Sequence, residues 1–222
     1  MSDLVVVVSG TNTGVGKTHV ACRVVEELKR RGASVVARKP VQTFDPSEKS
    51  LDAELLAAAS GESPASVCPP HRGYELALAP PMAARRLGRS PFSIQDLAAE
   101  LDLPSDGVAV VEGVGGPRSP LAEDGDTVRL STLIEADVVL LVSEPGLGAI
   151  NAVLSSVACF DRPTDVLLNR FDENCDLHRL NLEWLEDREK LPVFTKPDDF
   201  VRNLFERFPH KLPRSIDSVE VR

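Results

Sequence analysis

Residues 4–18 read LVVVVSGTNTGVGKT, and this stretch constrains the fold more than any other part of the chain. Its run of aliphatic residues predicts a strand buried on both faces, which belongs in a parallel sheet covered by helices. The glycines after the strand permit a sharp turn whose backbone N–H groups point at one place, and a helix beginning near Lys17 adds the positive end of its dipole. This order is typical of a phosphate-binding loop, in which Lys17 contacts the β- and γ-phosphates and the Thr18 hydroxyl ligates Mg²⁺.

The loop departs from the common pattern G-x-x-x-x-G-K-[ST] at one position. The pattern requires glycine at position 11, where this chain has Thr11, and the available Gly10 lies one residue further out. A chance glycine- and threonine-rich turn after a buried strand is therefore the alternative. We expect the nucleotide phosphates to bind at Gly14, Val15, Gly16, Lys17, Thr18 and His19.

Composition narrows the class of protein. The chain has 222 residues and a net charge of −9, which is enough length for a single domain over residues 1–222 and too acidic for a general nucleic-acid or anionic-membrane binder. No apolar stretch is long enough to span a bilayer and no basic leader precedes the first strand, so a cytoplasmic protein is expected. The four cysteines are scattered without a C-x-x-C pair, which disfavours disulfide and zinc sites.

A second charged group follows the next expected strand. Gly32 ends a helix over residues 19–31, and residues 35–37 form a short strand that a right-handed crossover places beside the first. This strand runs into RKPVQT, residues 38–43. Ligands of open α/β sheets sit beyond the carboxyl ends of the strands, so Lys39 would face the phosphate loop, with an ordinary exposed lysine as the alternative. Asp52 opens a helix over residues 51–60, where its charge complements the helix dipole.

Three further strands end in polar or glycine-rich segments. Residues 108–111 run into EGVGG, where the Glu112 carboxylate can ligate Mg²⁺ and the glycines admit a ligand closely; a solvent-facing rim residue is the alternative. Residues 138–142 precede GLGAIN, residues 146–151, which opens a helix whose free N–H groups suit a carboxylate. Residues 166–170 form the next strand, and Asn169 at its end offers a donor and an acceptor that match the edge of adenine.

The rest of the chain carries fewer signals. His71 and Arg72 are interpreted as solvated loop residues. A helix is expected over residues 180–191, with Trp184 in the core or at an interface, and residues 191–194 resemble a last strand.

Together, GTNTGVGKT, KPVQT, EGVGG, LGAIN and the Asn-Arg pair at 169–170 resemble the motifs of the dethiobiotin synthetase family, over roughly residues 4–200. The resemblance implies a P-loop NTPase-like α/β domain, with a mainly parallel sheet flanked by helices on both faces. It implies ATP and Mg²⁺ as cofactors and Lys17 and Lys39 as catalytic residues. The implied ligands are Thr18, Asp52 and Glu112 for the metal, Gly113, Val114, Gly115, Asn169 and Arg170 for the nucleotide, and Thr43, Gly148, Ala149, Ile150 and Asn151 for the substrate. The segment PRSP, residues 117–120, departs from the family's pattern.

The family's reaction is the penultimate step of biotin synthesis. In it, 7,8-diaminopelargonic acid takes up CO₂ as a carbamate, ATP phosphorylates the carbamate, and the ureido ring closes. The equivalent of the helix start at 148–151 comes from the neighbouring subunit, so the resemblance implies a homodimer with shared active sites, a small-molecule substrate, and no nucleic-acid or membrane partner.

Two alternatives share the phosphate loop. One is an amidoligase related to cobyrinic acid synthases, for which the chain is too short to include a glutaminase domain. The other is a partition-type regulatory ATPase that works as a dimer switch. Such ATPases carry a second lysine early in the loop, where this chain has Thr11, Asn12 and Thr13.

Overall fold

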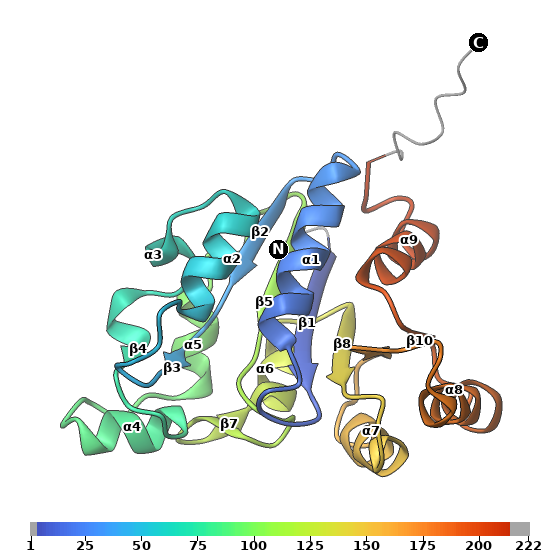
Figure 1. The fold of residues 1–222 in the computed structure, drawn as a ribbon. Coiled ribbons are helices and arrows are strands. Elements are labelled where there is room, and N and C mark those ends of the chain that lie inside the picture. Colours follow the sequence, from blue (N-terminus) through green and yellow to red (C-terminus); the bar gives the residue numbers. More distant parts are fainter. Residues whose placement is uncertain (1–3, 214–222) are drawn as a thin grey trace.

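The computed structural model describes residues 4–213, and its centre is a parallel sheet of six strands (Figure 1). In spatial order the strands are β10 (Val193–Phe194), β9 (Thr164–Leu168), β8 (Val138–Ser143), β1 (Leu4–Gly10), β5 (Val108–Glu112) and β2 (Val35–Arg38). β1 is buried along all seven residues, as its aliphatic run predicts. Its Val6 pairs with Val110 of β5 on one side and with Val138 of β8 on the other, so β1 lies inside the sheet.

The position of β2 corrects one expectation. The sequence predicts β2 beside β1, and this prediction is wrong because β5 pairs with both strands and separates them. β5 is buried along its whole length, whereas Val36 of β2 is partly exposed. The fully buried aliphatic strand therefore takes the interior position, and the shorter strand forms the edge of the sheet.

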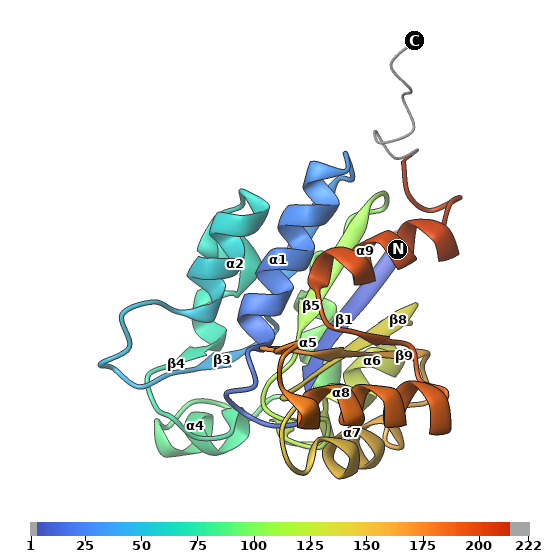
Figure 2. The ribbon, with the colours of Figure 1, turned by 45° about the vertical axis from the view of Figure 1, so that its right-hand side comes forward.

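Helices cover both faces of the sheet, which confirms the predicted α/β architecture (Figures 1 and 2). One face packs against α1 (Lys17–Arg30), α2 (Asp52–Ser60), α3 (Pro64–Val67) and α9 (Pro197–Arg207). The other packs against α4 (Pro80–Arg86), α5 (Ile94–Glu100), α6 (Thr127–Leu133), α7 (Ala149–Val157) and the segment containing α8 (Asp176–Glu183). The strands alternate between the two cores: Val6 and Val8 face the first set of helices, and Val5 and Val7 face the second.

Two short strand pairs lie outside the main sheet. They are β3 (Gln42–Thr43) with β4 (Gly73–Tyr74), and β6 (Pro120–Ala122) with β7 (Gly125–Asp126). A 3₁₀ turn, Pro70–Arg72, precedes β4. Arg72 is not the solvated loop residue that was expected. It is buried, with its guanidinium 4.4 Å from the centroid of the Phe92 ring and 2.6 Å from a carboxylate oxygen of Glu100.

The expected helix over residues 180–191 begins earlier and changes type. It is α8 followed by a π-helical turn, Trp184–Arg188, and the Trp184 side chain is 47% exposed, so it is not part of the core. Within residues 4–213, none of the helices is long and apolar enough to cross a membrane.

The parallel sheet gathers the sequence motifs at one edge. Because all six strands run in the same direction, their carboxyl ends lie together, and β1, β2, β5, β8 and β9 lead directly into the five segments that the sequence marked. The candidate site is therefore assembled from residues that are far apart in the chain.

Candidate active site

The loop between β1 and α1 has the backbone of an anion-binding loop. Gly14 and Gly16 have φ angles of 81° and 95°, in the left-handed region that glycine adopts without strain. The Lys17 side chain is buried, and its ammonium donates to the carbonyl of Asn12 at 3.1 Å. Burial and the neighbouring charge of Lys39 lower the pKa of Lys17. The loop therefore presents a concentrated positive potential where a phosphate would bind.

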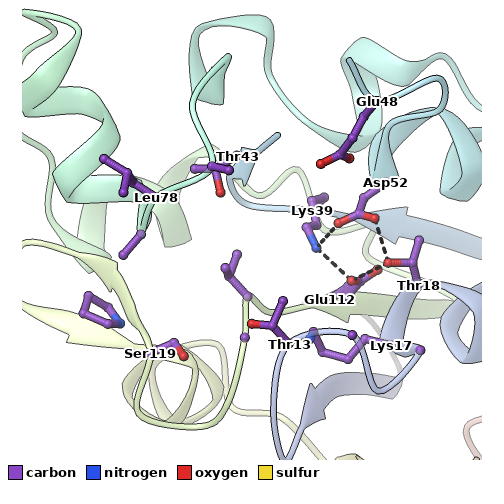
Figure 3. A pocket seen from close by; sticks show the side chains of 17 residues that line it. Thr13, Lys17, Thr18, Lys39, Thr43, Glu48, Asp52, Leu78, Glu112 and Ser119 are labelled. Carbon is purple, nitrogen blue, oxygen red and sulfur yellow. Dashed lines mark hydrogen bonds and ion pairs between the residues drawn. The ribbon is translucent and has the colours of Figure 1, made fainter. Parts of the chain in front are cut away.

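Four side chains from four elements meet beside this loop (Figure 3). The Thr18 hydroxyl of α1 lies 2.8 Å from Asp52 Oδ1 and 2.9 Å from Glu112 Oε1. The Lys39 ammonium, which follows β2, lies 2.8 Å from Asp52 Oδ2 and 2.7 Å from Glu112 Oε1. Lys39 also donates to the carbonyl of Gly113 at 3.2 Å. The structure thus brings together Lys39, Thr18, Asp52 and Glu112, which the sequence analysis had selected separately.

Burial and charge act against each other in this cluster. The side chains of Lys39 and Glu112 are only 3% and 1% exposed. Burial alone would lower the pKa of Lys39, but the carboxylates of Glu112 and Asp52 outweigh it and raise that pKa. Burial raises the pKa of Glu112, although the Lys39 charge opposes the shift. Lys39 is therefore a fixed positive charge at neutral pH.

The same oxygens fit a magnesium ion. The Thr18 hydroxyl, Asp52 and Glu112 offer hard oxygen donors that converge on one place, and Mg²⁺ is usually held by one or two carboxylates together with substrate phosphates. Glu112 Oε2 is buried without a hydrogen-bond partner among the described residues, so it has free coordinating capacity. Residues 4–213 contain no group of three or more His, Cys, Asp or Glu side chains that could hold a metal, so this site would rely on two carboxylates, the Thr18 hydroxyl and phosphate oxygens.

A cavity of about 590 Å³ opens beside the cluster. Lys17, Lys39 and the carboxylates of Asp52 and Glu112 lie on one side of the cavity, and Leu78 lies on the other (Figure 3). Apolar lining residues also include Ala77, Ala79, Val114 and Pro120. Thr43, at the end of β3, lies across the cavity from the phosphate loop. Such a cavity can hold a molecule with a polar reacting end and an aliphatic body.

Several residues that line this cavity were missed by the sequence analysis. Glu48 and Leu78 lie in loops without a recognisable pattern, and Ser119 lies in the segment that departs from the family's motif. The Ser119 hydroxyl accepts the N–H of Gly116 at 2.9 Å and so holds the turn after β5. Thr13 also lines the cavity, and its place directly before Gly14, the first expected phosphate-binding residue, was an available signal.

A second cavity, of about 640 Å³, lies on the other side of the phosphate loop. Gly148 and Ala149 line it together with Val15 and Arg170, whereas Ile150 and Asn151 do not. The structure therefore does not bring the 148–151 segment to Thr43 within one chain.

Only some of the remaining expected residues line these two cavities. His19 is exposed on α1 and lines neither cavity. Gly115 and Val114 line the first cavity. Gly113 leaves room for Thr127, since a Cβ at this position would lie 2.4 Å from the Thr127 hydroxyl oxygen. Asn169 contacts the outer side of the phosphate loop, where its amide nitrogen donates to the carbonyl of Val15 at 2.8 Å.

Known proteins resemble this chain in fold and in sequence. Among solved structures, a putative plasmid partition protein from Borrelia burgdorferi bound to AMPPNP has a TM-score of 0.56 at 13% identity, covering 96% of this chain and 100% of that one. Cobyrinic acid a,c-diamide synthase from Mycobacterium smegmatis, with a bound ATP analogue and magnesium, has a TM-score of 0.53 at 16% identity, covering 95% and 98%. At these identities the likeness shows the P-loop NTPase-like fold alone.

Sequence similarity is more specific. A family described as AAA domain matches residues 5–196. The ATP-dependent dethiobiotin synthetase of Haloferax mediterranei is 36% identical over 96% of this chain and 94% of its own length. The enzyme of the same name from Anaeromyxobacter dehalogenans is 33% identical over 88% and 91%. A third, from a Caulobacter species, is 38% identical over 68% and 67%. The chain therefore belongs to the family of ATP-dependent dethiobiotin synthetases.

Proposed function

We propose that this chain forms dethiobiotin from 7,8-diaminopelargonic acid, CO₂ and ATP, and that the cluster of Lys17, Thr18, Lys39, Asp52 and Glu112 is where the phosphoryl group transfers. The observation that carries the proposal is the arrangement of these five side chains at the charged end of a cavity whose other end is apolar. The substrate has the matching shape, with two adjacent amines at one part of an aliphatic chain and a carboxylate at its far end.

The bond changes follow from the substrates. One amine attacks CO₂, loses a proton and becomes a carbamate. A carbamate oxygen then attacks the γ-phosphorus of ATP, ADP leaves, and a carbamic–phosphoric anhydride forms. The second amine attacks the carbonyl carbon, phosphate leaves, and the cyclic urea closes. Two of the three steps move negative charge between oxygens, so catalysis depends on positioning and charge neutralisation.

Each cluster residue has a part in this scheme. Lys17 contacts the β- and γ-phosphates, and Lys39 neutralises the carbamate and the transferring phosphoryl group. Thr18, Asp52 and Glu112 would hold Mg²⁺, which neutralises phosphate charge when bound. Gly14, Val15 and Gly16 bind the phosphates through their backbone N–H groups. Val114 and Gly115, which line the first cavity, would contact the nucleotide and the substrate, whereas Gly113 makes room for Thr127.

The far ends of nucleotide and substrate need other residues. Asn169 and Arg170 follow β9, where we place the adenine base. The side-chain amide nitrogen of Asn169 is bound to the loop, so its side-chain amide oxygen would accept a hydrogen bond from the amino group of the base. Thr43 contacts the reacting end of the diamine. The substrate carboxylate would bind at Gly148, Ala149, Ile150 and Asn151 of a second subunit, because within one chain this segment lines a different cavity from Thr43. In this proposal the active form is a homodimer that acts in the cytoplasm, where ATP is available.

Omission of single substrates tests the proposal. Purified protein with ATP, Mg²⁺, bicarbonate and diaminopelargonate should release phosphate and form a product with the mass of dethiobiotin. Leaving out either bicarbonate or the diamine should abolish phosphate release. Release that continues without the diamine would indicate a plain ATPase and overturn the proposal.

A further inference from the structure

The end of β9 holds the outer side of the phosphate loop. Asn169 donates from its amide nitrogen to the carbonyl of Val15 at 2.8 Å, and Arg170 reaches the carbonyl of Gly14 with its guanidinium at 3.4 Å. Asn169 is itself anchored, because its backbone N–H donates to the carbonyl of Ser143, the last residue of β8, at 2.8 Å. Two consecutive loop carbonyls are therefore bound by two consecutive residues from a distant part of the chain.

These contacts fix the direction of two N–H groups. In a trans peptide unit the C=O and the N–H that follows it point in opposite directions, and the described chain has no cis peptide bonds. When the Val15 carbonyl faces Asn169, the Gly16 N–H must point away from Asn169, and both Gly16 and Lys17 line the first cavity. By the same rule, the Gly14 carbonyl held at Arg170 directs the Val15 N–H inward.

The loop needs an outside constraint of this kind. Gly14 and Gly16 flank Val15, and glycine adopts left-handed and right-handed backbone angles about equally well. Rotation of either peptide unit would therefore cost little, and it would replace an inward N–H by an inward carbonyl that repels phosphate. A donor on the outer side penalises that rotation, because it would leave a carbonyl and an amide without partners.

Asn169 and Arg170, together called the loop clamp below, fit closely against the phosphate loop, as two further features show. A Cβ on Gly16 would lie 2.2 Å from the Asn169 amide nitrogen, so the loop backbone and this side chain occupy adjoining space without a gap. Arg170 has a φ of 60°, which is unfavourable for a residue with a side chain, and its guanidinium is also bound by the Glu144 carboxylate at 2.5 Å. Strain of this kind persists only where surrounding contacts impose it.

We propose that Asn169 and Arg170 are positioning residues for the phosphate loop: by holding the carbonyls of Val15 and Gly14 outward, they aim the N–H groups of Gly16 and Val15 at the nucleotide phosphates. This role rests on the proposed function and adds to it, because it makes the phosphate affinity depend on Asn169 whether or not a base is present. The side-chain amide nitrogen of Asn169 binds the loop, and its side-chain amide oxygen is left to bind the base.

The test uses Asn169→Leu, which keeps the branching of asparagine and removes its hydrogen-bonding groups. Inorganic tripolyphosphate, ATP and GTP are titrated into wild type and variant in the presence of Mg²⁺, and binding is measured by calorimetry. We expect the variant to bind all three ligands more weakly, by a similar factor of about ten. Unchanged tripolyphosphate binding with a loss confined to ATP would mean that Asn169 reads only the base, and would overturn the inference.

A matched control is available in Asn181. Its buried amide nitrogen donates to two backbone carbonyls, Pro145 and Gly146, at 2.8 and 2.9 Å, in a loop that does not bind phosphate in our scheme. Asn181→Leu removes the same kind of contact and should leave tripolyphosphate affinity unchanged. An equal loss of affinity in this control would mean that Asn169 acts only through general stability.

Amide NMR distinguishes a positioning role from a purely structural one. Adding tripolyphosphate to wild type should shift the Gly16 and Val15 amide protons, and these shifts should be absent or reduced in Asn169→Leu while the amides of β10 stay unchanged in both. Asn169→Ala is the second variant, should the leucine not fold. Wild type that binds neither ATP nor tripolyphosphate overturns the proposed function, whereas normal binding by both variants overturns only the loop clamp.

Discussion

At the scale of single residues, Lys39 and a bound metal ion would compete for the same carboxylate oxygens. Its ammonium lies 2.7–2.8 Å from oxygens of the two carboxylates that we assign to Mg²⁺. A divalent ion on those oxygens would neutralise them and weaken their hold on the lysine. Metal binding would thereby free Lys39 to turn toward the reacting groups.

Replacing this lysine should therefore tighten metal binding in the absence of nucleotide. Lys39→Met keeps the side-chain length and removes the competing charge, so we expect Mn²⁺ affinity, measured by electron paramagnetic resonance, to rise by about tenfold. Turnover should fall at the same time, more in kcat than through KM. Lys196→Met is the control, because Lys196 pairs with Glu173 at the surface at 3.7 Å. Weaker or unchanged Mn²⁺ binding in Lys39→Met would show that the lysine and the metal do not share these oxygens.

Lys17 and Thr18 should each be needed for turnover and not for folding. Lys17→Ala removes a charge that we assign to the phosphates, and Thr18→Val removes a hydroxyl that faces the two carboxylates. Loss of one such contact typically costs about 3–4 kcal/mol of transition-state stabilisation, a factor of roughly 10²–10³ in rate. Phosphate release measures the effect, with far-UV circular dichroism as the control for folding. Near-normal release by either variant would remove that residue from the mechanism.

The sequence predicted the charged residues of the site better than their supporting contacts. Lys39, Asp52 and Glu112 each follow or open a recognisable element, and motif resemblance was sufficient to select them. The bond from Asn169 to Val15 joins positions 154 residues apart, and it depends on how β9 is placed in the sheet. Arg72 was misjudged for a related reason, since its partners Glu100 and Phe92 are distant in sequence and only the fold brings them to it.

At the scale of elements, α1 carries a buried acidic group that links stability to pH. Glu27 accepts hydrogen bonds from Arg30 and Arg31 at 2.6 to 2.7 Å, and its side chain is 6% exposed. The hydrogen bonds from Arg30, and then those from Arg31, outweigh burial and lower the pKa of Glu27 from 4.5 to about 2. Because the folded pKa lies below the unfolded one, this stabilisation is complete above about pH 4.5 and disappears as the pH falls toward 2.

Glu27→Gln should therefore destabilise the protein at neutral pH. We expect the free energy of unfolding at pH 7 to fall by about 1–3 kcal/mol. The expected loss is modest because Arg30 is well exposed, so that solvent partly screens its charge. Urea unfolding at several pH values should show the difference between wild type and variant shrinking as the pH falls from 4.5 toward 2. Glu26→Gln in the same helix is the control, since Glu26 and its partner Arg23 are both about half exposed. A difference from wild type no larger than that of Glu26→Gln would contradict the linkage.

The strands of the main sheet were largely predictable from the sequence, and their order was not. The aliphatic runs of β1, β5 and β8 identify buried strands directly, because only a strand covered on both faces is apolar at every position. Which strands pair depends on long-range contacts that no local pattern records. β2 and β5 are both short apolar runs in sequence, VVAR and VAVVE, so the sequence alone did not place β5 between β1 and β2.

At the scale of the whole molecule, the main prediction concerns a second subunit. A single domain over residues 1–222 and a homodimer with shared sites are predictions that follow from the family. Mixing two inactive variants tests the shared site: Lys17→Ala damages the phosphate loop, and Asn151→Glu adds a charge that repels the substrate carboxylate on an exposed residue of α7. In a mixed dimer both lesions fall in one site and the other site has neither. Equal mixing by co-refolding should restore about one quarter of wild-type activity.

Subunit exchange must be verified for this result to be interpreted. Differently tagged variants, purified through both tags in sequence, provide the mixed dimer. A mixed dimer without activity would contradict a shared site. An active monomer at micromolar concentration, measured by analytical ultracentrifugation, would contradict it as well.

The clamp on the phosphate loop also has a consequence for the time course of synthesis. The ribosome completes Val15 long before Asn169, and at about 5–20 residues per second the 154 intervening positions take roughly 8 to 30 seconds. During that interval the loop exists without the side chain that orders it, and ATP in the cell has no finished site to occupy. By our proposal, the nascent chain therefore binds nucleotide phosphates more weakly until five of the six strands, through β9, have been made.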